Sequence, residues 1–170
     1  MSMLPEVPIS KTRNAFWWGI FLVPAVTLQS LIPGVDFLLA GFLVTLQERR
    51  YADLFWVLPL LIMLQEGMGT RAFGAVLLWY AAAAAVFFLG RWLFDIESFL
   101  YAFLLSACLA ACHFAIAFLM SPLYAVAVDM HMHRLLDESV YLALLLPACW
   151  KLARFTRKWA YADNTEYSEK

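Results

Sequence analysis

Residues Ala72–Leu89 read AFGAVLLWYAAAAAVFFL, an uncharged run almost as long as the roughly 20 residues that a helix needs to cross a lipid bilayer. The chain is 64% hydrophobic and only 15% charged, which is too apolar for a soluble domain of this length. The pattern predicts an all-α membrane protein, folded as a compact bundle of six transmembrane helices. Five further apolar runs lie before and after Ala72–Leu89, which is the fourth of the six in chain order. They are Ala15–Ile32, Val35–Gln47, Ala52–Glu66, Phe99–Met120 and Ser139–Leu152.

The basic residues are distributed unevenly over the segments that connect these runs. Ten of the twelve Lys and Arg residues fall on the side that holds both termini, and only Arg71 and Arg134 fall on the other side. Because Lys and Arg are in excess on the cytoplasmic side of inner-membrane proteins, both termini are predicted to be cytoplasmic. The chain then divides into a cytoplasmic amino arm (1–14), a six-helix transmembrane domain (15–152) and a basic, then acidic, cytoplasmic tail (153–170).

Several of the predicted helices are short or contain proline. The second, third and sixth runs reach only about 20–22 Å at 1.5 Å per residue, which is less than the thickness of the hydrocarbon layer. Pro24, Pro59 and Pro147 lie inside the first, third and sixth runs. Each proline removes a backbone hydrogen bond and favours a kink, so a compact bundle of bent helices is expected.

The turn between the third and fourth runs carries the deepest charged residue. Glu66 ends the third run, and Arg71 follows five residues later on a short turn that also contains Gly67, Gly69 and Gly74. An ion pair between Glu66 and Arg71 that pins this hairpin is the favoured interpretation. A substrate or proton site is the alternative, because ionisable groups inside membranes are costly and often functional.

Small and basic residues suggest packing and anchoring surfaces. Closely spaced alanines let helix backbones approach each other, so they indicate either an internal seam, which is favoured, or a docking face. Basic residues at the end of the sixth run are expected to contact anionic lipid headgroups. The predicted packing residues are Ala81, Ala82, Ala83, Ala84, Ala85, Ala107, Ala111 and Ala115, and the predicted headgroup anchors are Lys151, Arg154, Arg157 and Lys158.

Residues with metal-binding or catalytic chemistry are few. Cys108 and Cys112 lack a second pair of ligands at a suitable spacing. His131 and His133 share a face only if their segment is an extended loop, so they are weak metal candidates. No phosphate-binding loop, zinc-protease or serine-hydrolase motif is present. We therefore expect no enzyme activity, no cofactor and no nucleic-acid partner.

The segment EGMGTRAFG, residues 66–74, resembles the hairpin between the third and fourth helices of the MreD family of rod shape-determining proteins. In that family an acidic residue ends one helix, glycines follow, and a hydrophobic residue with glycine opens the next. Chain length, six predicted spans, and a last helix that contains Pro147 and leads into a basic tail also agree with the family. One departure is that the family more often has Asp where this chain has Glu66.

The resemblance implies a non-enzymatic scaffold or adaptor in the bacterial cell inner (plasma) membrane, which helps to maintain cell shape. Such a protein couples the cell-elongation machinery, or elongasome, to peptidoglycan synthesis. Expected partners are membrane lipids and, by resemblance, MreC, RodA and the elongation transpeptidase. Two alternatives remain open: a substrate-binding membrane component of a small-molecule, vitamin-type transporter, and a small anchor subunit of a respiratory membrane complex.

Overall fold

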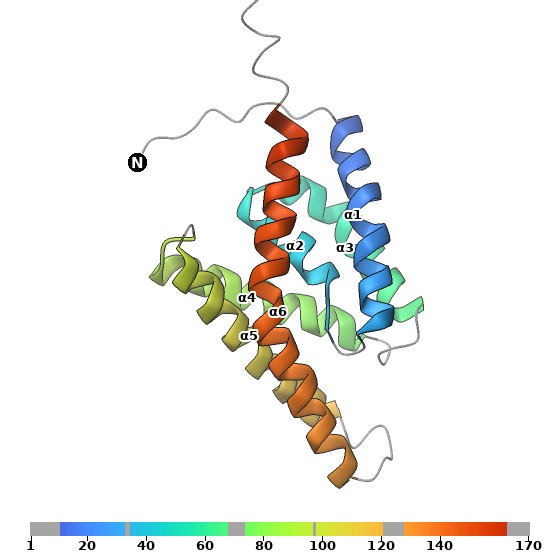
Figure 1. Ribbon diagram of the computed structural model, residues 1–170, viewed down its shortest axis with the longest axis vertical. Coiled ribbons are helices and arrows are strands. Elements are labelled where there is room, and N and C mark those ends of the chain that lie inside the picture. Colours follow the sequence, from blue (N-terminus) through green and yellow to red (C-terminus); the bar gives the residue numbers. More distant parts are fainter. Residues whose placement is uncertain (1–10, 33–34, 68–73, 97, 121–127, 163–170) are drawn as a thin grey trace, which may run out of the picture.

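The computed structural model describes residues 11–32, 35–67, 74–96, 98–120 and 128–162, and this part of the chain contains six α-helices and no β-strand (Figure 1). The prediction of an all-α fold with six helices is therefore confirmed. In chain order the helices are α1 (Lys11–Leu31), α2 (Leu38–Gln47), α3 (Tyr51–Gly67), α4 (Ala75–Leu93), α5 (Phe99–Met120) and α6 (Val128–Ala162).

The short helix α2 is the centre of the fold. Every residue from Leu38 to Leu46 is buried, and the helix packs against α1, α3, α4 and α6. Its first turn is held by Asp36, whose carboxylate accepts a hydrogen bond from the N–H of Leu39 at 3.1 Å. With 10 residues the helix is about 15 Å long, so α2 is too short to cross a bilayer by itself.

The last helix is much longer than the predicted run Ser139–Leu152. α6 has 35 residues, which corresponds to about 52 Å. Arg134 and Glu138 precede the apolar run and form an i,i+4 ion pair at 2.9 Å, an arrangement that supports a helix instead of ending it. Charged residues therefore mark the end of an apolar run here but not the end of the helix.

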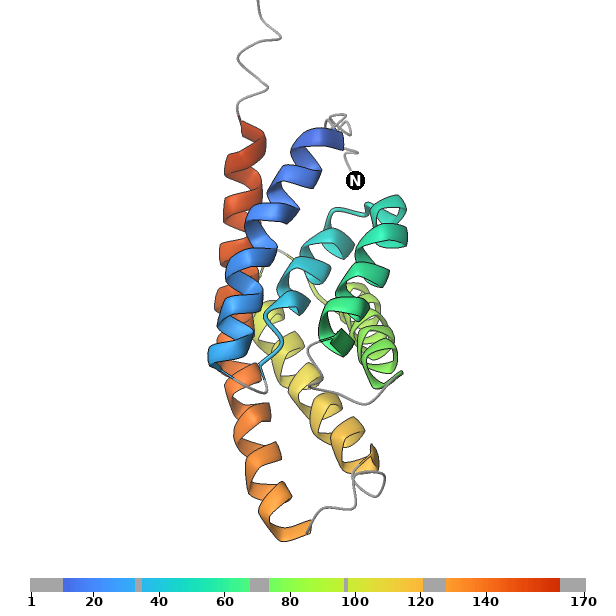
Figure 2. The same cartoon turned by 90° about the vertical axis from the view of Figure 1, so that its right-hand side faces the viewer.

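The helices do not all lie along one direction. α4 is seen from the side in Figure 1 and nearly end-on in Figure 2, so it runs across the long direction of α6. Two helices, Ala75–Leu93 and Leu100–Leu119, are long and apolar enough to cross a membrane among the residues described. Because spanning helices seldom tilt by more than about 40°, this arrangement does not confirm a bundle of six spans.

A glycine allows α1 and α2 to pack closely. A Cβ atom added at Gly41 would lie 2.5 Å from Cε1 of Phe21 and 3.0 Å from Cη2 of Trp18. Trp18 is fully buried, whereas Phe21 is partly exposed and stacks on Trp17 with ring centroids 5.0 Å apart, so a side chain at position 41 would have to displace the Phe21 ring from this stack. Glycine at this position therefore allows the closest contact between the two helices without moving either ring.

We expect Gly41→Leu to reduce stability by about 1–3 kcal/mol, the usual cost of overpacking a core. Gly19→Ala is the matched control, because nothing lies within 4 Å of a Cβ atom there and alanine favours a helix by up to about 1 kcal/mol. The measurement is the thermal unfolding midpoint of each purified variant. Equal midpoints for Gly41→Leu and the wild-type protein would contradict the close contact.

Candidate functional site

A buried arginine joins three helices at the end of the molecule where α1 begins and α6 ends. The side chain of Arg157, on α6, is 1% exposed and lies 2.8 Å from Oε2 of Glu48, the C-cap residue of α2. Its guanidinium carbon is 4.6 Å from the ring centroid of Trp17 on α1. A buried guanidinium requires such compensation, because the cost of leaving water is several kcal/mol.

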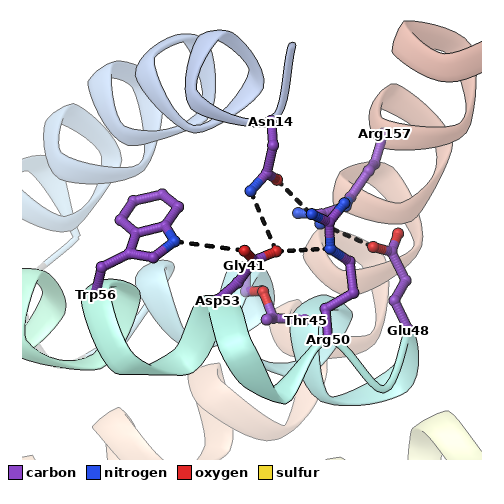
Figure 3. Close-up of polar contacts among 8 residues, drawn as sticks. All are labelled: Asn14, Gly41, Thr45, Glu48, Arg50, Asp53, Trp56 and Arg157. Atoms are coloured by element: carbon purple, nitrogen blue, oxygen red, sulfur yellow. Dashed lines mark hydrogen bonds and ion pairs between the residues drawn. The ribbon is translucent and has the colours of Figure 1, made fainter. Parts of the chain in front are cut away.

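A second ion pair is linked to the first by one carboxamide. Arg50 contacts Asp53, in the first turn of α3, with Nε and Oδ2 2.6 Å apart. The carboxamide of Asn14 donates to Oδ2 of Asp53 at 3.2 Å and accepts from Nη2 of Arg157 at 3.3 Å (Figure 3). Since an amide has both a donor and an acceptor, Asn14 connects the carboxylate of one pair with the cation of the other. We call these residues, together with Glu48, the Arg157 cluster.

The environment of Glu48 makes its carboxyl harder to ionise than it is in water. Burial raises the pKa of the Glu48 carboxyl above its ordinary value of 4.5, although the charge and hydrogen bond of Arg157 act in the opposite direction. The desolvation of Glu48 therefore outweighs its attraction to Arg157.

We expect Arg157→Met to lower the free energy of unfolding by about 2–3 kcal/mol, since it removes three contacts of a buried side chain and leaves Glu48 without its cation. Glu48→Gln is expected to cost less than Arg157→Met, because the amide still accepts a hydrogen bond from the guanidinium although the negative charge is lost. Lys158→Met is the control, because Lys158 lies on the same helix but is exposed. Thermal unfolding of the three variants in detergent provides the measurement.

The pH dependence of stability shows whether the neutral or the charged form of the Glu48 carboxyl stabilises the fold more. A carboxyl group whose pKa is raised on folding stabilises the fold below its unfolded pKa, and this stabilisation is lost as the pH rises through the folded pKa. The unfolding midpoint of the wild-type protein, relative to that of Glu48→Gln, should therefore fall between about pH 4.5 and neutral pH. A relative midpoint that rises over this range would contradict the environment described for Glu48.

A cavity of about 370 Å³ lies next to the Arg157 cluster. It is formed by the C-terminal ends of α2 and α4 and by the C-terminal part of α6, and Glu48 belongs to both the cluster and the cavity wall. Arg49, on this wall, has φ 57°, in the left-handed region that residues other than glycine rarely adopt. The lining residues are Val44, Gln47, Glu48, Arg49, Arg91, Asp95, Ile96, Arg154 and Lys158.

Polar side chains also connect helices inside the fold. The indole N–H of Trp79 donates to Oδ2 of buried Asp36 at 2.8 Å, and the Trp79 ring packs edge-on against His113, with centroids 5.5 Å apart. Nδ1 of His113 lies 3.4 Å from Oγ of Ser139. This chain links the start of α2 to α4, α5 and α6. His113 is thus held by protein groups, and its position between two helices is that of a buried packing histidine.

The hairpin between α3 and α4 uses Glu66 as a cap. Oε1 of Glu66 accepts a hydrogen bond from the N–H of Gly74 at 3.0 Å, and Gly74 has φ 81°. Gly74 is the N-cap residue of α4 and has no side chain, and the Glu66 carboxylate bonds the backbone N–H of this N-cap residue itself, beside the positive end of the helix. Gly67 ends α3 and is exposed. The predicted partner Arg71, together with Gly69, lies outside the described residues.

We expect Glu66→Ala to reduce the amount of folded protein, because losing a helix cap costs about 0.5–2 kcal/mol. Glu66→Gln keeps an oxygen that accepts the Gly74 hydrogen bond and is expected to fold nearly as well as the wild-type protein. Detergent-solubilised yield and unfolding midpoint measure both effects. A loss with Gln as large as with Ala would show that the negative charge, and not the cap, is required.

The structure places other predicted residues differently from the sequence-based expectation. Of the alanines Ala81–Ala85 only Ala83 is fully buried, so one position of the run packs internally. Three alanines that were expected to pack against another helix are exposed, because α5 turns its Leu105 and Leu109 face toward the core: Ala107, Ala111 and Ala115.

The predicted headgroup anchors separate into two groups. Lys151 and Lys158 are exposed and Arg154 is half-buried, whereas Arg157 is buried in the cluster, so the prediction for Arg157 was wrong. The physical reason is the position of Arg157 along α6. It follows the preceding buried residues at the spacing of three or four that places side chains on one face of a helix. The buried positions of this face are Leu142, Leu146, Trp150, Ala153 and Arg157.

The weak metal candidates are on a helix and not in a loop. His131 and His133 belong to the first turns of α6, where residues two apart point about 200° away from each other, so the extended geometry that would place them on one face is absent. His133 is exposed, and the side chain of His131 is not described. Within the described ranges no three His, Cys, Asp or Glu side chains form a group that could hold a metal ion.

No protein-family model matches the chain, and no curated protein or solved structure shows a significant similarity to it.

Proposed function

We propose that the chain is a non-enzymatic scaffold with several membrane-spanning helices, similar in role to the MreD proteins that its hairpin sequence resembles. The observation that carries this proposal is the apolar surface. Every helix except α2 exposes large apolar side chains, among them Phe55 on α3, Trp92 on α4 and Phe118 on α5. Large apolar side chains exposed on five helices are typical of proteins that contact lipid or other membrane proteins.

The internal polar contacts support the same role. The Arg157 cluster and the Asp36–Trp79–His113–Ser139 chain use polar groups to hold helices together. A scaffold needs this rigidity, because partners must find the same surface in every copy. Most polar side chains of the interior therefore already have a structural task.

The hairpin supports the family resemblance at the level of geometry. The segment that resembles MreD begins with Glu66 and ends with Gly74, and a hydrogen bond of 3.0 Å joins these two residues. An acidic residue and a distant glycine thus have a physical reason to occur together. The spacing in the sequence is the spacing needed for the carboxylate to cap the next helix.

Within the described part of the chain, no observation favours the transporter alternative in the same way. A vitamin-type component would need a pocket near Glu66, at the end of α3, on the side predicted to face outward. The cavity beside Arg49 lies at the beginning of α3 instead, and α3, with 17 residues, is about 25 Å long. The respiratory alternative likewise has no support from His113, whose ring contacts Trp79 and Ser139.

The test is affinity purification of the tagged full-length protein from its own membranes in mild detergent, followed by mass spectrometry. We expect MreC, RodA or the elongation transpeptidase to be enriched over a mock purification. A tagged, unrelated polytopic protein of similar abundance controls for nonspecific membrane carry-over. Enrichment of an ATPase-coupled transport module or of respiratory subunits, without the elongation proteins, would contradict the proposal.

A further inference from the structure

The cavity beside the Arg157 cluster has more positive than negative charge. Glu48 is already paired with Arg157 at 2.8 Å, and Arg157 is not part of the cavity wall, so the charge of Glu48 is balanced from outside the cavity. Asp95 is the other carboxylate of the wall. Asp95 and Arg154 each take part in further interactions, so neither is counted, and the other three cations of the wall have no carboxylate paired with them among the described residues. The charged lining residues are Arg49, Arg91, Arg154, Lys158, Glu48 and Asp95.

The neighbouring helix ends do not remove this excess. The C-terminal ends of α2 and α4 border the cavity, and each contributes about half a negative charge, so an excess of about two positive charges remains. Arg49, Arg91 and Lys158 form no ion pair with a residue that the structure describes. Cations collected around a hollow in this way repel each other unless an anion lies between them.

We propose that this cavity binds a phosphate-bearing anion. Guanidinium groups form paired hydrogen bonds with phosphate oxygens, and the wall contains three arginines. The volume of about 370 Å³ lies within the range of small-molecule sites. Val44 and Ile96 add an apolar part of the wall, which suits the organic portion of a phosphate ester.

The backbone places Arg49 at the end of α2. Its φ of 57° belongs to the turn that ends this helix, in which the N–H of Arg49 donates to the carbonyl of Leu46 at 3.2 Å and the N–H of Arg50 donates to the carbonyl of Thr45 at 3.4 Å. The helix thus ends at the cavity, and Arg49 belongs to the cavity wall.

Two sources supply this chemistry. The cavity lies at the end of the molecule predicted to face the cytoplasm, where anionic phospholipid headgroups are abundant and basic pockets between helices bind them. A soluble phosphate compound is the other source. The inference does not depend on the proposed scaffold role, since a scaffold and a transporter component could both carry such a site.

The experiment uses the full-length protein, purified in detergent and stripped of lipid. Inorganic pyrophosphate is titrated by calorimetry, and retention of phosphatidylglycerol against phosphatidylcholine is measured by native mass spectrometry. We expect at least one of the two anions to bind. Binding of pyrophosphate identifies a soluble phosphate as the ligand type, and preference for phosphatidylglycerol alone identifies a lipid headgroup.

Two cavity variants and one control locate the binding. Arg49→Asn removes the charge and tolerates the left-handed backbone, and Arg91→Gln removes a second cation independently. Each should weaken binding about tenfold or more, the value of one charge-assisted hydrogen bond. Arg134→Gln removes an exposed cation near the start of α6, paired with Glu138, and should leave the affinity within about twofold.

The outcomes separate a built site from general attraction. Unfolding midpoints are measured first, and if Arg49→Asn does not fold, Arg91→Gln carries the test. Failure of both pyrophosphate and phosphatidylglycerol to bind would overturn the proposal. A loss of affinity in Arg134→Gln equal to that in the cavity variants would also overturn it, because the binding would then follow overall charge. Neither outcome bears on the partners expected for a scaffold.

Discussion

A buried guanidinium is costly unless the fold supplies compensating contacts, and Arg157 has a carboxylate, a carboxamide oxygen and an aromatic face beside it. Its partners come from the beginning of α1 and the end of α2, which are 143 residues and more than 100 residues away in the chain, respectively. Satisfying this one side chain therefore fixes where α6 lies relative to α1 and α2. The central helix α2 is then enclosed by its neighbours, and Gly41 lets α1 approach it closely.

The same constraint shapes the charge at this end of the molecule. Glu48 is paired with Arg157 on the core side, so it does not neutralise the cations of the cavity wall on its other side. Arg50 and Asp53 neutralise each other and are tied to Arg157 through Asn14. Of the ten basic residues that the sequence places on one side, two thus belong to the structural cluster and four to the cavity wall. The two parts have different expected roles, because one is closed by protein groups and the other is open to a ligand.

Much of the fold could be predicted from the sequence because long apolar runs form helices, and the charged residues and turns between the runs separate one helix from the next. The run Phe99–Met120 and helix α5 have the same ends. The length of α6 was missed, because hydropathy ends at charged residues whereas helices end only where capping or packing stops them. Arg157 was missed for the related reason that its charge suggested the surface. The available signal was its spacing, four residues beyond Ala153 on the face that also buries Trp150 and Leu146. The capping role of Glu66 was not predictable, since it depends on the left-handed backbone of Gly74.

The most direct measurement of the central claim is a distance distribution between the ends of α1 and α6. Spin labels are placed at the exposed positions Thr12 and Lys158, after Cys108, Cys112 and Cys149 have been replaced by alanine, and pulsed electron paramagnetic resonance records the distances. If Arg157 holds α6 against α1 and α2, the distribution is narrow with Arg157 present and becomes broad or shifted in Arg157→Met. Distributions of equal width and position in both proteins would contradict the account, because the helices would then be held together without the buried arginine.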